Sequence, residues 1–354
     1  MSRVVVGMSG GVDSSLAAAL LVEQGHEVIG VSMHLAGASS RCCSLDDADD
    51  ARQVAAQLGI RFYVANYTRE FRSQVMLPFA DAYLSGRTPL PCALCNTHFK
   101  FDRLLSRARA LGADTVATGH YARRGVDPES GRPTLSRALD PQKDQSYFLF
   151  GLTAEQLEGA RFPLGELDKA TVRARARALG LATADKPESQ ELCFVPDGDT
   201  GAVVEALRPD VAPGEGDIVD EAGRRLGRHR GIHRYTVGQR RGLSLAGPRP
   251  LYVKALDAAR NRVVVGPEAA LEADSARVES VNWIAGSAPA GRIEAQVRIR
   301  YRHEGAPAAV EARPDGSTSV RFHEPVRALA PGQAAVFYDG ERVLGGGWIA
   351  GPDA

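Results

Sequence analysis

Short apolar runs alternate with amphipathic stretches over the first 120 residues. Apolar runs rich in β-branched residues predict buried strands at residues 4–7, 27–33, 60–65 and 114–118. Apolar positions at helical spacing predict helices between them, at residues 14–23, 45–58, 71–84 and 99–111. This alternation is typical of a doubly wound parallel sheet in an α/β fold, whose ligands bind at the carboxyl ends of the strands. We therefore expect residues 7–9, Met33 and residues 118–120 to converge on one crevice.

The pattern changes near residue 200, where Gly, Pro and Arg become frequent. Short alternating strands such as 251–255 and 262–266 predict a small β-rich module. Further runs at 295–301, 319–322 and 333–338 are separated by regular turn signals, which indicates a small barrel. We therefore predict three domains, which are a catalytic α/β domain at 1–203, a central β-rich domain at 204–272 and a β-barrel at 273–354.

Residues 9–15 read Ser-Gly-Gly-Val-Asp-Ser-Ser and join the first strand to the first helix. Gly10 and Gly11 permit close backbone approach, and the hydroxyls and helix N–H groups are donors for an anion. A plain helix N-cap is the alternative, because Asp and Ser are favoured there. The P-loop pattern that holds a transferable γ-phosphate is absent. The sequence instead resembles the PP-loop of ATP pyrophosphatases, which cleave ATP between the α- and β-phosphates. Asp13 is expected to orient a metal or the loop itself.

Composition narrows the class of protein. The 354 residues suffice for two or three domains, and 44% hydrophobic with 24% charged residues is typical of globular proteins. The formal net charge is +0, so a nucleic acid would have to be bound by local basic patches. The N-terminus enters a strand at once and no apolar stretch approaches the ~20 residues that span a bilayer. We expect a cytoplasmic protein whose cysteines are catalytic or metal-binding rather than disulfide-bonded.

The five cysteines fall into three groups. Cys92 and Cys95 form a Cys-x-x-Cys pair in a Pro-flanked segment that is expected to be a loop, whereas Cys193 stands far along the chain. A single such pair is compatible with redox, zinc or iron–sulfur chemistry, although no second pair completes a zinc site. Cys42 and Cys43 precede a helix, and inert packing stays open for them.

Several motifs in order along the chain resemble those of bacterial tRNA-specific 2-thiouridylases, the MnmA family of the PP-loop superfamily. The matching stretches are residues 7–14, 95–96, 117–123, 143–149, 193–194, 235–243, 300–302 and 331–338. The resemblance covers nearly the whole chain and implies a HUP-type first domain. It also implies ATP-dependent 2-thiolation of the wobble uridine in tRNA.

The resemblance assigns roles to individual residues. ATP, with Mg²⁺, would be bound by Gly7, Met8, Ser9, Gly10, Gly11, Val12, Asp13, Ser14, Met33 and Gly119. Cys193 would carry persulfide sulfur, supplied by a cysteine desulfurase or a relay protein, and Cys95 would be the partner thiol, leaving a Cys95–Cys193 disulfide. The tRNA contacts would be Leu90, Pro91, Cys92, His120, Lys143, Asp144, Gln145, Arg300, Tyr301 and Gln333.

One position departs from the family pattern. Many members have an Asp three residues before the first catalytic cysteine, where this chain has Cys92, so an acid–base role at that position has no carrier here. An alternative is that Cys92, Cys95 and Cys193 ligate a [4Fe–4S] cluster.

Three stretches of the sequence are rich in arginine and could contact RNA or face solvent. Residues 224–241 contain seven arginines and no acidic residue, interleaved with Tyr235 and histidines, which favours phosphate contacts with base stacking. Arg298, Arg300 and Arg302 are expected to line one face of a strand, with Tyr301 on the other. A helical stretch with arginines at 173, 175 and 177 is expected to be a solvated face.

Two other functions remain open from the sequence alone. One is a different PP-loop adenylating synthetase, which would not need separated cysteines. The other is a nucleotide-binding redox or iron–sulfur sensor that binds RNA without modifying it.

Overall fold

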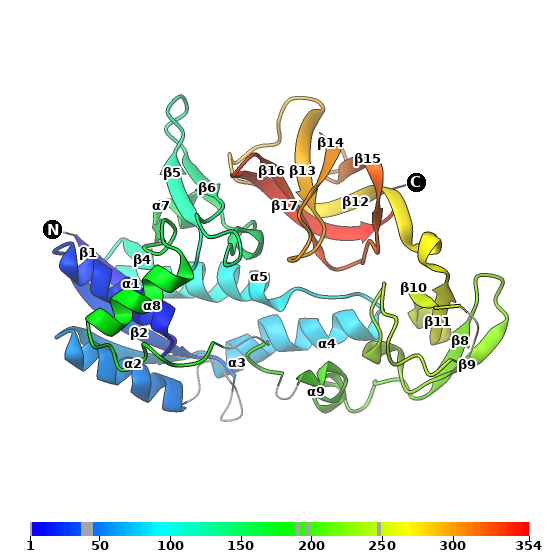
Figure 1. Cartoon of the computed structure of the whole chain (residues 1–354), viewed down its shortest axis with the longest axis horizontal. Coiled ribbons are helices and arrows are strands. Elements are labelled where there is room, and N and C mark those ends of the chain that lie inside the picture. The colour runs from blue at the N-terminus through cyan, green and yellow to red at the C-terminus, as the bar shows by residue number, and fades with distance from the viewer. Residues whose placement is uncertain (1, 37–44, 189–191, 196–197, 246–248, 354) are drawn as a thin grey trace.

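The computed structural model describes residues 2–36, 45–188, 192–195, 198–245 and 249–353, and Figure 1 shows their arrangement. Three sheets follow one another, a parallel sheet near the N-terminus, a small central sheet and a C-terminal barrel. Within the described residues, no helix is long and apolar enough to traverse a bilayer.

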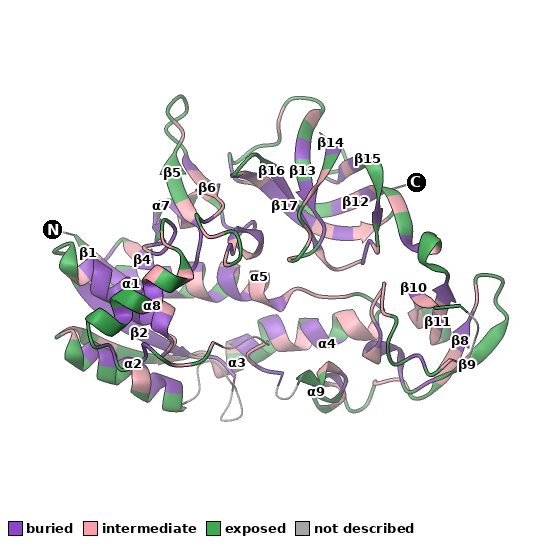
Figure 2. Cartoon of the chain, in the orientation of Figure 1, coloured by how far each residue is buried: buried purple, intermediate pink, exposed green. Residues whose placement is uncertain are grey.

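The N-terminal sheet has five strands in the order β3-β2-β1-β4-β7, all paired in parallel. The strands are β1 (Arg3–Gly7), β2 (Glu27–His34), β3 (Arg61–Asn66), β4 (Thr115–Ala117) and β7 (Ala160–Arg161). Val4 and Val6 face a core shared with α1 (Val12–Glu23), α2 (Leu45–Gln57) and α8 (Lys169–Ala178), whereas Val5 faces a second core. Both faces are therefore covered, which confirms the predicted doubly wound sheet. Figure 2 shows β1, β2 and α1 as largely buried, whereas the edge strand β3 is mostly exposed.

Two long helical segments cover the second face. The first consists of α3 (Thr68–Phe71), the π-helical η1 (Arg72–Met76) and α4 (Leu77–Leu84). The second consists of α5 (Pro91–Cys95), the π-helical η2 (Asn96–Arg103) and α6 (Leu104–Ala110). The expected loop around Cys92 and Cys95 was wrong, because Pro91 occupies the first helical turn, where its missing N–H costs nothing.

Smaller elements connect the N-terminal sheet to the rest of the chain. They are the hairpin β5 (Arg123–Val126) and β6 (Pro133–Ser136), η3 (Ser146–Phe148), α7 (Ala154–Glu158) and α9 (Thr200–Leu207). Strand β6 pairs with the barrel strand β17, so the hairpin extends the sheet of the C-terminal domain.

The central sheet has the order β10-β11-β8-β9 and packs around its own small apolar core. Its elements are β8 (Gly216–Val219), β9 (Arg225–His229), η5 (Ile232–Arg234), β10 (Tyr252–Asp257), η6 (Ala258–Arg260), β11 (Arg262–Gly266) and η7 (Glu268–Leu271).

The C-terminal strands form a closed barrel in the order β12-β15-β14-β13-β16-β17, with β17 pairing back to β12. The strands are β12 (Glu272–Trp283), β13 (Ile293–Arg298), β14 (Ala306–Ala312), β15 (Thr318–Arg327), β16 (Ala334–Asp339) and β17 (Arg342–Gly351). This confirms the predicted barrel.

Polar contacts fix the barrel to the segment after the hairpin. The buried Arg298 guanidinium donates to the Asp144 carboxylate at 3.1 Å, and the Tyr147 hydroxyl donates to the Ala334 carbonyl at 2.9 Å. Asn282 donates to the Phe150 carbonyl at 2.7 Å. Residues 144–150 are therefore shared between the two domains.

Candidate functional site

The loop between β1 and α1 has a conformation that depends on glycine and on its own serine hydroxyls. Gly10 has φ +71°, and a Cβ there would lie 2.2 Å from the Asp47 carbonyl oxygen, so only glycine fits. The Ser14 hydroxyl accepts from the Ser9 N–H and donates to the Gly11 carbonyl, both at 3.1 Å. Gly11 is the N-cap residue, so the alternative of an Asp or Ser cap was wrong. The first N–H groups of α1 therefore remain as donors at the loop.

A pocket of about 300 Å³ opens at this loop. It is lined by Gly7, Met8, Ser9, Gly11, Val12, Asp13, Ser14, Met33 and Gly119, nearly all of the residues expected to bind ATP. His120 and Gln145, expected at the tRNA, line the same pocket. A Cβ at Gly119 would lie 2.7 Å from the Ser14 nitrogen, so glycine lets β4 approach the helix start. The predicted convergence at the strand ends is confirmed.

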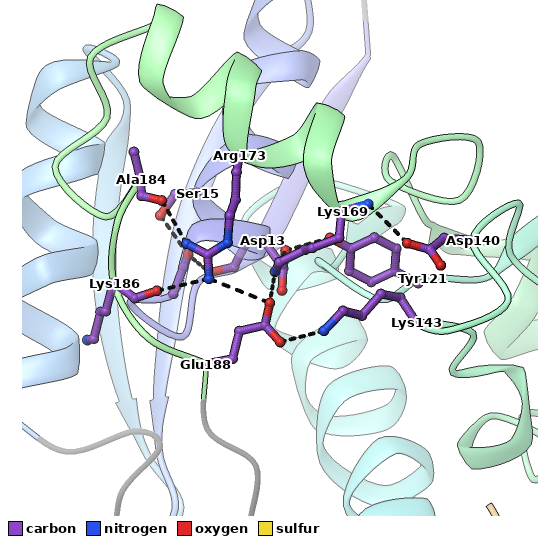
Figure 3. A network of polar contacts seen from close by, with 12 residues as sticks. Asp13, Ser15, Tyr121, Asp140, Lys143, Lys169, Arg173, Ala184, Lys186 and Glu188 are labelled. Atoms are coloured by element: carbon purple, nitrogen blue, oxygen red, sulfur yellow. Dashed lines mark hydrogen bonds and ion pairs between the residues drawn. The ribbon is translucent and has the colours of Figure 1, made fainter. Parts of the chain in front are cut away.

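A network of ion pairs surrounds one side of the pocket (Figure 3). Oδ1 of Asp13 accepts from the Lys169 ammonium and from the Tyr121 hydroxyl, both at 2.7 Å. Lys169 also contacts Glu188 at 2.5 Å, and Lys143 donates to the other oxygen of Glu188 at 2.7 Å. Burial alone would raise the pKa of Glu188, but the two lysines outweigh it and lower the pKa to about 2. Glu188 is therefore a carboxylate at neutral pH.

His120 is a buried, neutral side chain in the pocket wall. Burial, assisted by the Lys100 ammonium, lowers the pKa of His120 well below its ordinary value. Because an ammonium can only donate, Nε2 accepts from Lys100 at 3.4 Å, and Nδ1 donates to the Thr118 hydroxyl at 2.6 Å. The imidazole thus serves as a fixed polar group rather than as a cation.

Cys95 and Cys193 lie on the second face of the N-terminal sheet. Cys95 is buried in its core, and Cys193 packs against the same core from the later segment. The neighbouring Phe194 ring lies 5.8 Å from the ring of Phe71, which fixes this segment against the long helices. Cys42 and Cys43 lie outside the described residues.

The cysteine geometry gives the iron–sulfur alternative no support. Among the residues that the structure describes, no group of three or more His, Cys, Asp or Glu side chains could hold a metal ion. Cys92, Cys95 and Cys193 therefore do not form a three-thiolate site in this arrangement.

Four other residues expected at the tRNA lie in two places, three of them around the start of α5 and Asp144 in the interior. Leu90 and Pro91 precede and begin α5, and Gln333 donates to the Thr88 carbonyl at 3.0 Å beside them. Asp144 is buried, accepting from the Ser146 N–H at 3.1 Å and pairing with Arg298. The buried Asp144 carboxylate therefore fixes the backbone around Lys143 and Gln145 by its hydrogen bond to Ser146 and its ion pair with Arg298.

The predicted strand through residues 298–302 was wrong. Strand β13 ends at Arg298, which is buried, and Arg300, Tyr301 and Arg302 lie in the turn that follows. The Tyr301 ring lies 4.6 Å from the Phe148 ring. The arginines therefore do not alternate along one exposed face.

The arginine-rich stretch is also less available to RNA than its sequence indicates. Carboxylates from other segments pair with Arg224, Arg225, Arg228 and Arg234. Tyr235, His229 and His233 are buried, so the expected stacking of bases on these rings was wrong. Arg240 and Arg241 are exposed in the following loop. Arg173, expected on a solvated face, instead donates to the Ala184 carbonyl at 3.1 Å.

Sequence reasoning missed several side chains of the pocket. These are Asp47, Lys100, Lys186 and Glu188, with Lys169 and Tyr121 behind them. Apart from Tyr121, which lies in the motif at 117–123, these residues are charged and belong to no local motif. Only the fold brings them together.

Comparisons with known proteins find similar domains along the whole chain. Three family profiles match, described as a tRNA methyl transferase HUP domain at residues 2–197, a tRNA methyl transferase PRC-barrel domain at 205–267 and an aminomethyltransferase beta-barrel domain at 273–349. A 4-thiouridine synthetase–RNA complex with bound ATP is similar in structure, with TM-score 0.36 and 16% identity, over 59% of this chain and 50% of that one.

Curated relatives match over nearly the whole chain. The tRNA-specific 2-thiouridylase MnmA of Geotalea uraniireducens is 53% identical over 98% of this chain and 94% of its own length. That of Magnetococcus marinus is 52% identical over 98% of both chains. With the phosphate loop, the pocket and the two separated cysteines in place, the chain belongs to the tRNA-specific 2-thiouridylase (MnmA) family of sulfurtransferases.

Proposed function

We propose that this chain uses ATP to convert the wobble uridine of tRNA into 2-thiouridine. The observation that carries the proposal is the composition of one pocket. Glycines and serines suited to phosphate line it together with His120 and Gln145, which are suited to a base. ATP and the target uridine could therefore meet there. A wobble base is normally stacked, so it would have to be turned out of the anticodon loop to enter.

The first step would activate a poor leaving group. The C2 carbonyl oxygen of uridine attacks the α-phosphorus of ATP, pyrophosphate leaves, and the oxygen becomes part of an AMP ester. N–H groups at the start of α1 and the hydroxyl of Ser9 are donors suited to the phosphates. Lys100, in the pocket wall, adds a positive charge.

The second step would deliver sulfur. The outer sulfur of a Cys193 persulfide attacks C2, and AMP leaves with the former carbonyl oxygen. The Cys95 thiolate then attacks the Cys193 sulfur, which releases 2-thiouridine and leaves a Cys95–Cys193 disulfide. An external dithiol reductant restores both thiols. The packing of both cysteines against one core supports this pairing.

Mg²⁺ would reach the site on the phosphates of ATP. Magnesium ions in nucleotide sites use phosphate oxygens, water and only one or two carboxylates. Asp13 and Asp47 are carboxylates in the pocket wall, and the lysines beside them leave further oxygens for such a contact. Mg²⁺ would neutralise charge on the phosphates when bound.

We also propose how the partners engage. The exposed Arg240 and Arg241 would contact tRNA phosphates, and a persulfide-bearing cysteine desulfurase or relay protein would load Cys193. We further propose residues 1–203 as the catalytic domain, 204–272 as a tRNA-binding domain and 273–354 as the barrel domain.

Nucleoside mass spectrometry tests the proposed function. The protein is incubated with ATP, Mg²⁺, unmodified tRNA and a persulfide donor, and the digested tRNA is analysed. We expect 2-thiouridine and an equal amount of AMP. Tight binding of tRNA and nucleotide without any thiolated uridine would instead indicate a sensor.

A further inference from the structure

The pocket that we assign to ATP has an acidic lining. The carboxylates of Asp13, Asp47 and Glu188 face it, among the glycines and hydroxyls of the loop. A triphosphate carries several negative charges, and carboxylates close to it weaken its binding. The pocket can therefore accept ATP only if cations neutralise these side chains.

Lysines supply this compensation. Lys100 also lines the pocket, and Lys186 and Lys169 form ion pairs with its carboxylates. Lys186 contacts Asp47 at 2.7 Å and Asp50 at 2.6 Å. Lys169 contacts Asp13 at 2.7 Å and Glu188 at 2.5 Å, and its side chain is only 12% exposed. Water screens a side chain this buried only weakly, so Lys169 is the better placed of the two to act on charge inside the pocket.

The fold holds Lys169 in place from several directions. It begins α8 directly after the N-cap residue Asp168, and its backbone N–H donates to Asp140 at 3.1 Å. Its ammonium lies 5.7 Å from the centre of the Tyr121 ring, whose hydroxyl donates to the same Asp13 oxygen. The ammonium position is therefore set by the backbone and by two neighbouring side chains, as Figure 3 shows.

Glu188 connects this lysine to the sulfur-carrying part of the chain. Its second oxygen is held by Lys143 at 2.7 Å, and Arg173 lies 3.7 Å from the first. Glu188 stands five positions before Cys193. Lys169 thus joins the loop for ATP to the start of the segment that carries Cys193.

We propose that Lys169 is a positioning residue, which neutralises the acidic lining of the ATP pocket and, through Glu188, ties the ATP loop to the Cys193 segment. This inference rests on the proposed function, because it assigns ATP to the pocket and sulfur to Cys193. It adds a chain of contacts from the ATP loop to Glu188, which stands five positions before Cys193 in the sequence.

Lys169→Met tests the charge. Asp13 loses its paired lysine, whereas Glu188 keeps Lys143 and Arg173 beside it. One positive charge is thus lost beside the triphosphate, so we expect KM for ATP to rise at least tenfold while KM for tRNA stays within twofold. Lys169→Arg keeps the charge and should restore most of the ATP affinity. The double variant Lys169→Met/Glu188→Gln also removes the Glu188 carboxylate, one of the two that pair with Lys169. It should therefore recover part of the ATP affinity as well. Arg177→Met is the matched control, since it removes an exposed cation that pairs with Asp185 on the same helix.

Glu188→Gln tests the connection without touching Lys169. Removing a negative charge near ATP cannot weaken ATP binding electrostatically, so KM for ATP should not rise. Loss of the contacts that hold Glu188, five positions before Cys193, should lower kcat for 2-thiouridine at least fivefold. A wild-type kcat for this variant would overturn the connection, and a wild-type KM for ATP in a folded Lys169→Met variant would overturn the charge role.

The wild-type protein separates failure of this inference from failure of the proposed function. If wild-type protein forms no 2-thiouridine, the proposed function fails. If it does, and the two variants behave as wild type, only the role of Lys169 fails. Circular dichroism and thermal unfolding establish whether each variant is folded. If Lys169→Met does not fold, the kcat and KM of Glu188→Gln test the proposal instead.

Discussion

Arg298 fastens the barrel to the N-terminal domain, and its loss should destabilise the barrel strongly. Its guanidinium donates to Asp144 at 3.1 Å, to the His303 carbonyl at 2.8 Å and to the Tyr301 carbonyl. The side chains of Arg298 and Asp144 are 9% and 5% exposed, so the pair lies in a poorly solvated environment. Removing one partner of such a pair costs about 3–5 kcal/mol, because the other charge stays buried without compensation.

We therefore expect Arg298→Met to lower the free energy of unfolding of the barrel by about 3–5 kcal/mol. Adding Asp144→Asn removes the uncompensated charge and should recover part of that loss. Both tryptophans of the chain, Trp283 and Trp348, lie in barrel strands, so their fluorescence in urea follows barrel unfolding.

The control is Arg277→Met, which removes an exposed pair with Asp315 on the same barrel and should leave the urea midpoint close to that of the wild type. A wild-type midpoint for Arg298→Met would refute the reasoning. A double variant no more stable than Arg298→Met would show that the buried charge is not the cause.

Three further predictions concern the pocket, the thiols and the basic loop. Gly10→Ala puts a Cβ 2.2 Å from a carbonyl oxygen and should weaken ATP binding at least tenfold by calorimetry, so unchanged affinity would contradict the loop geometry. Cys95→Ser and Cys193→Ser should each abolish 2-thiouridine formation, and the double variant should be no worse, whereas residual transfer by either would argue against a two-thiol unit. Arg240→Ala/Arg241→Ala should lower the salt slope of tRNA binding by about 1 to 2 and spare ATP binding, and wild-type affinity at low salt would count against that contact.

Local pattern accounts for the elements that were predicted correctly. Strands β1, β2 and β4 contain nearly continuous apolar runs, because both of their faces are buried, whereas the edge strand β3 is largely exposed. The glycines and serines of the phosphate loop work through their own backbone and hydroxyls, so their role is visible in a short stretch of sequence. The start of α5 was missed because Pro91 was interpreted as a loop residue, although proline also suits a first helical turn.

Long-range partners account for what was missed. Arg298 alternates with Arg300 in sequence, but the buried Asp144, far away in the chain, draws it into the interior. The arginine-rich stretch has no acid of its own, yet Glu205 and other carboxylates neutralise much of it. The ion pairs of Lys169 likewise join segments that no local pattern connects.

The fate of the uridine oxygen tests most directly whether ATP activates the C2 carbonyl. An anticodon stem-loop with oxygen-18 at C2 of the wobble uridine is incubated with the protein, ATP and a persulfide donor, and the AMP is analysed by mass spectrometry. Because this oxygen becomes part of the AMP ester and leaves with it, AMP should carry oxygen-18 in an amount equal to the 2-thiouridine formed. Formation of 2-thiouridine with unlabelled AMP would contradict activation by adenylation.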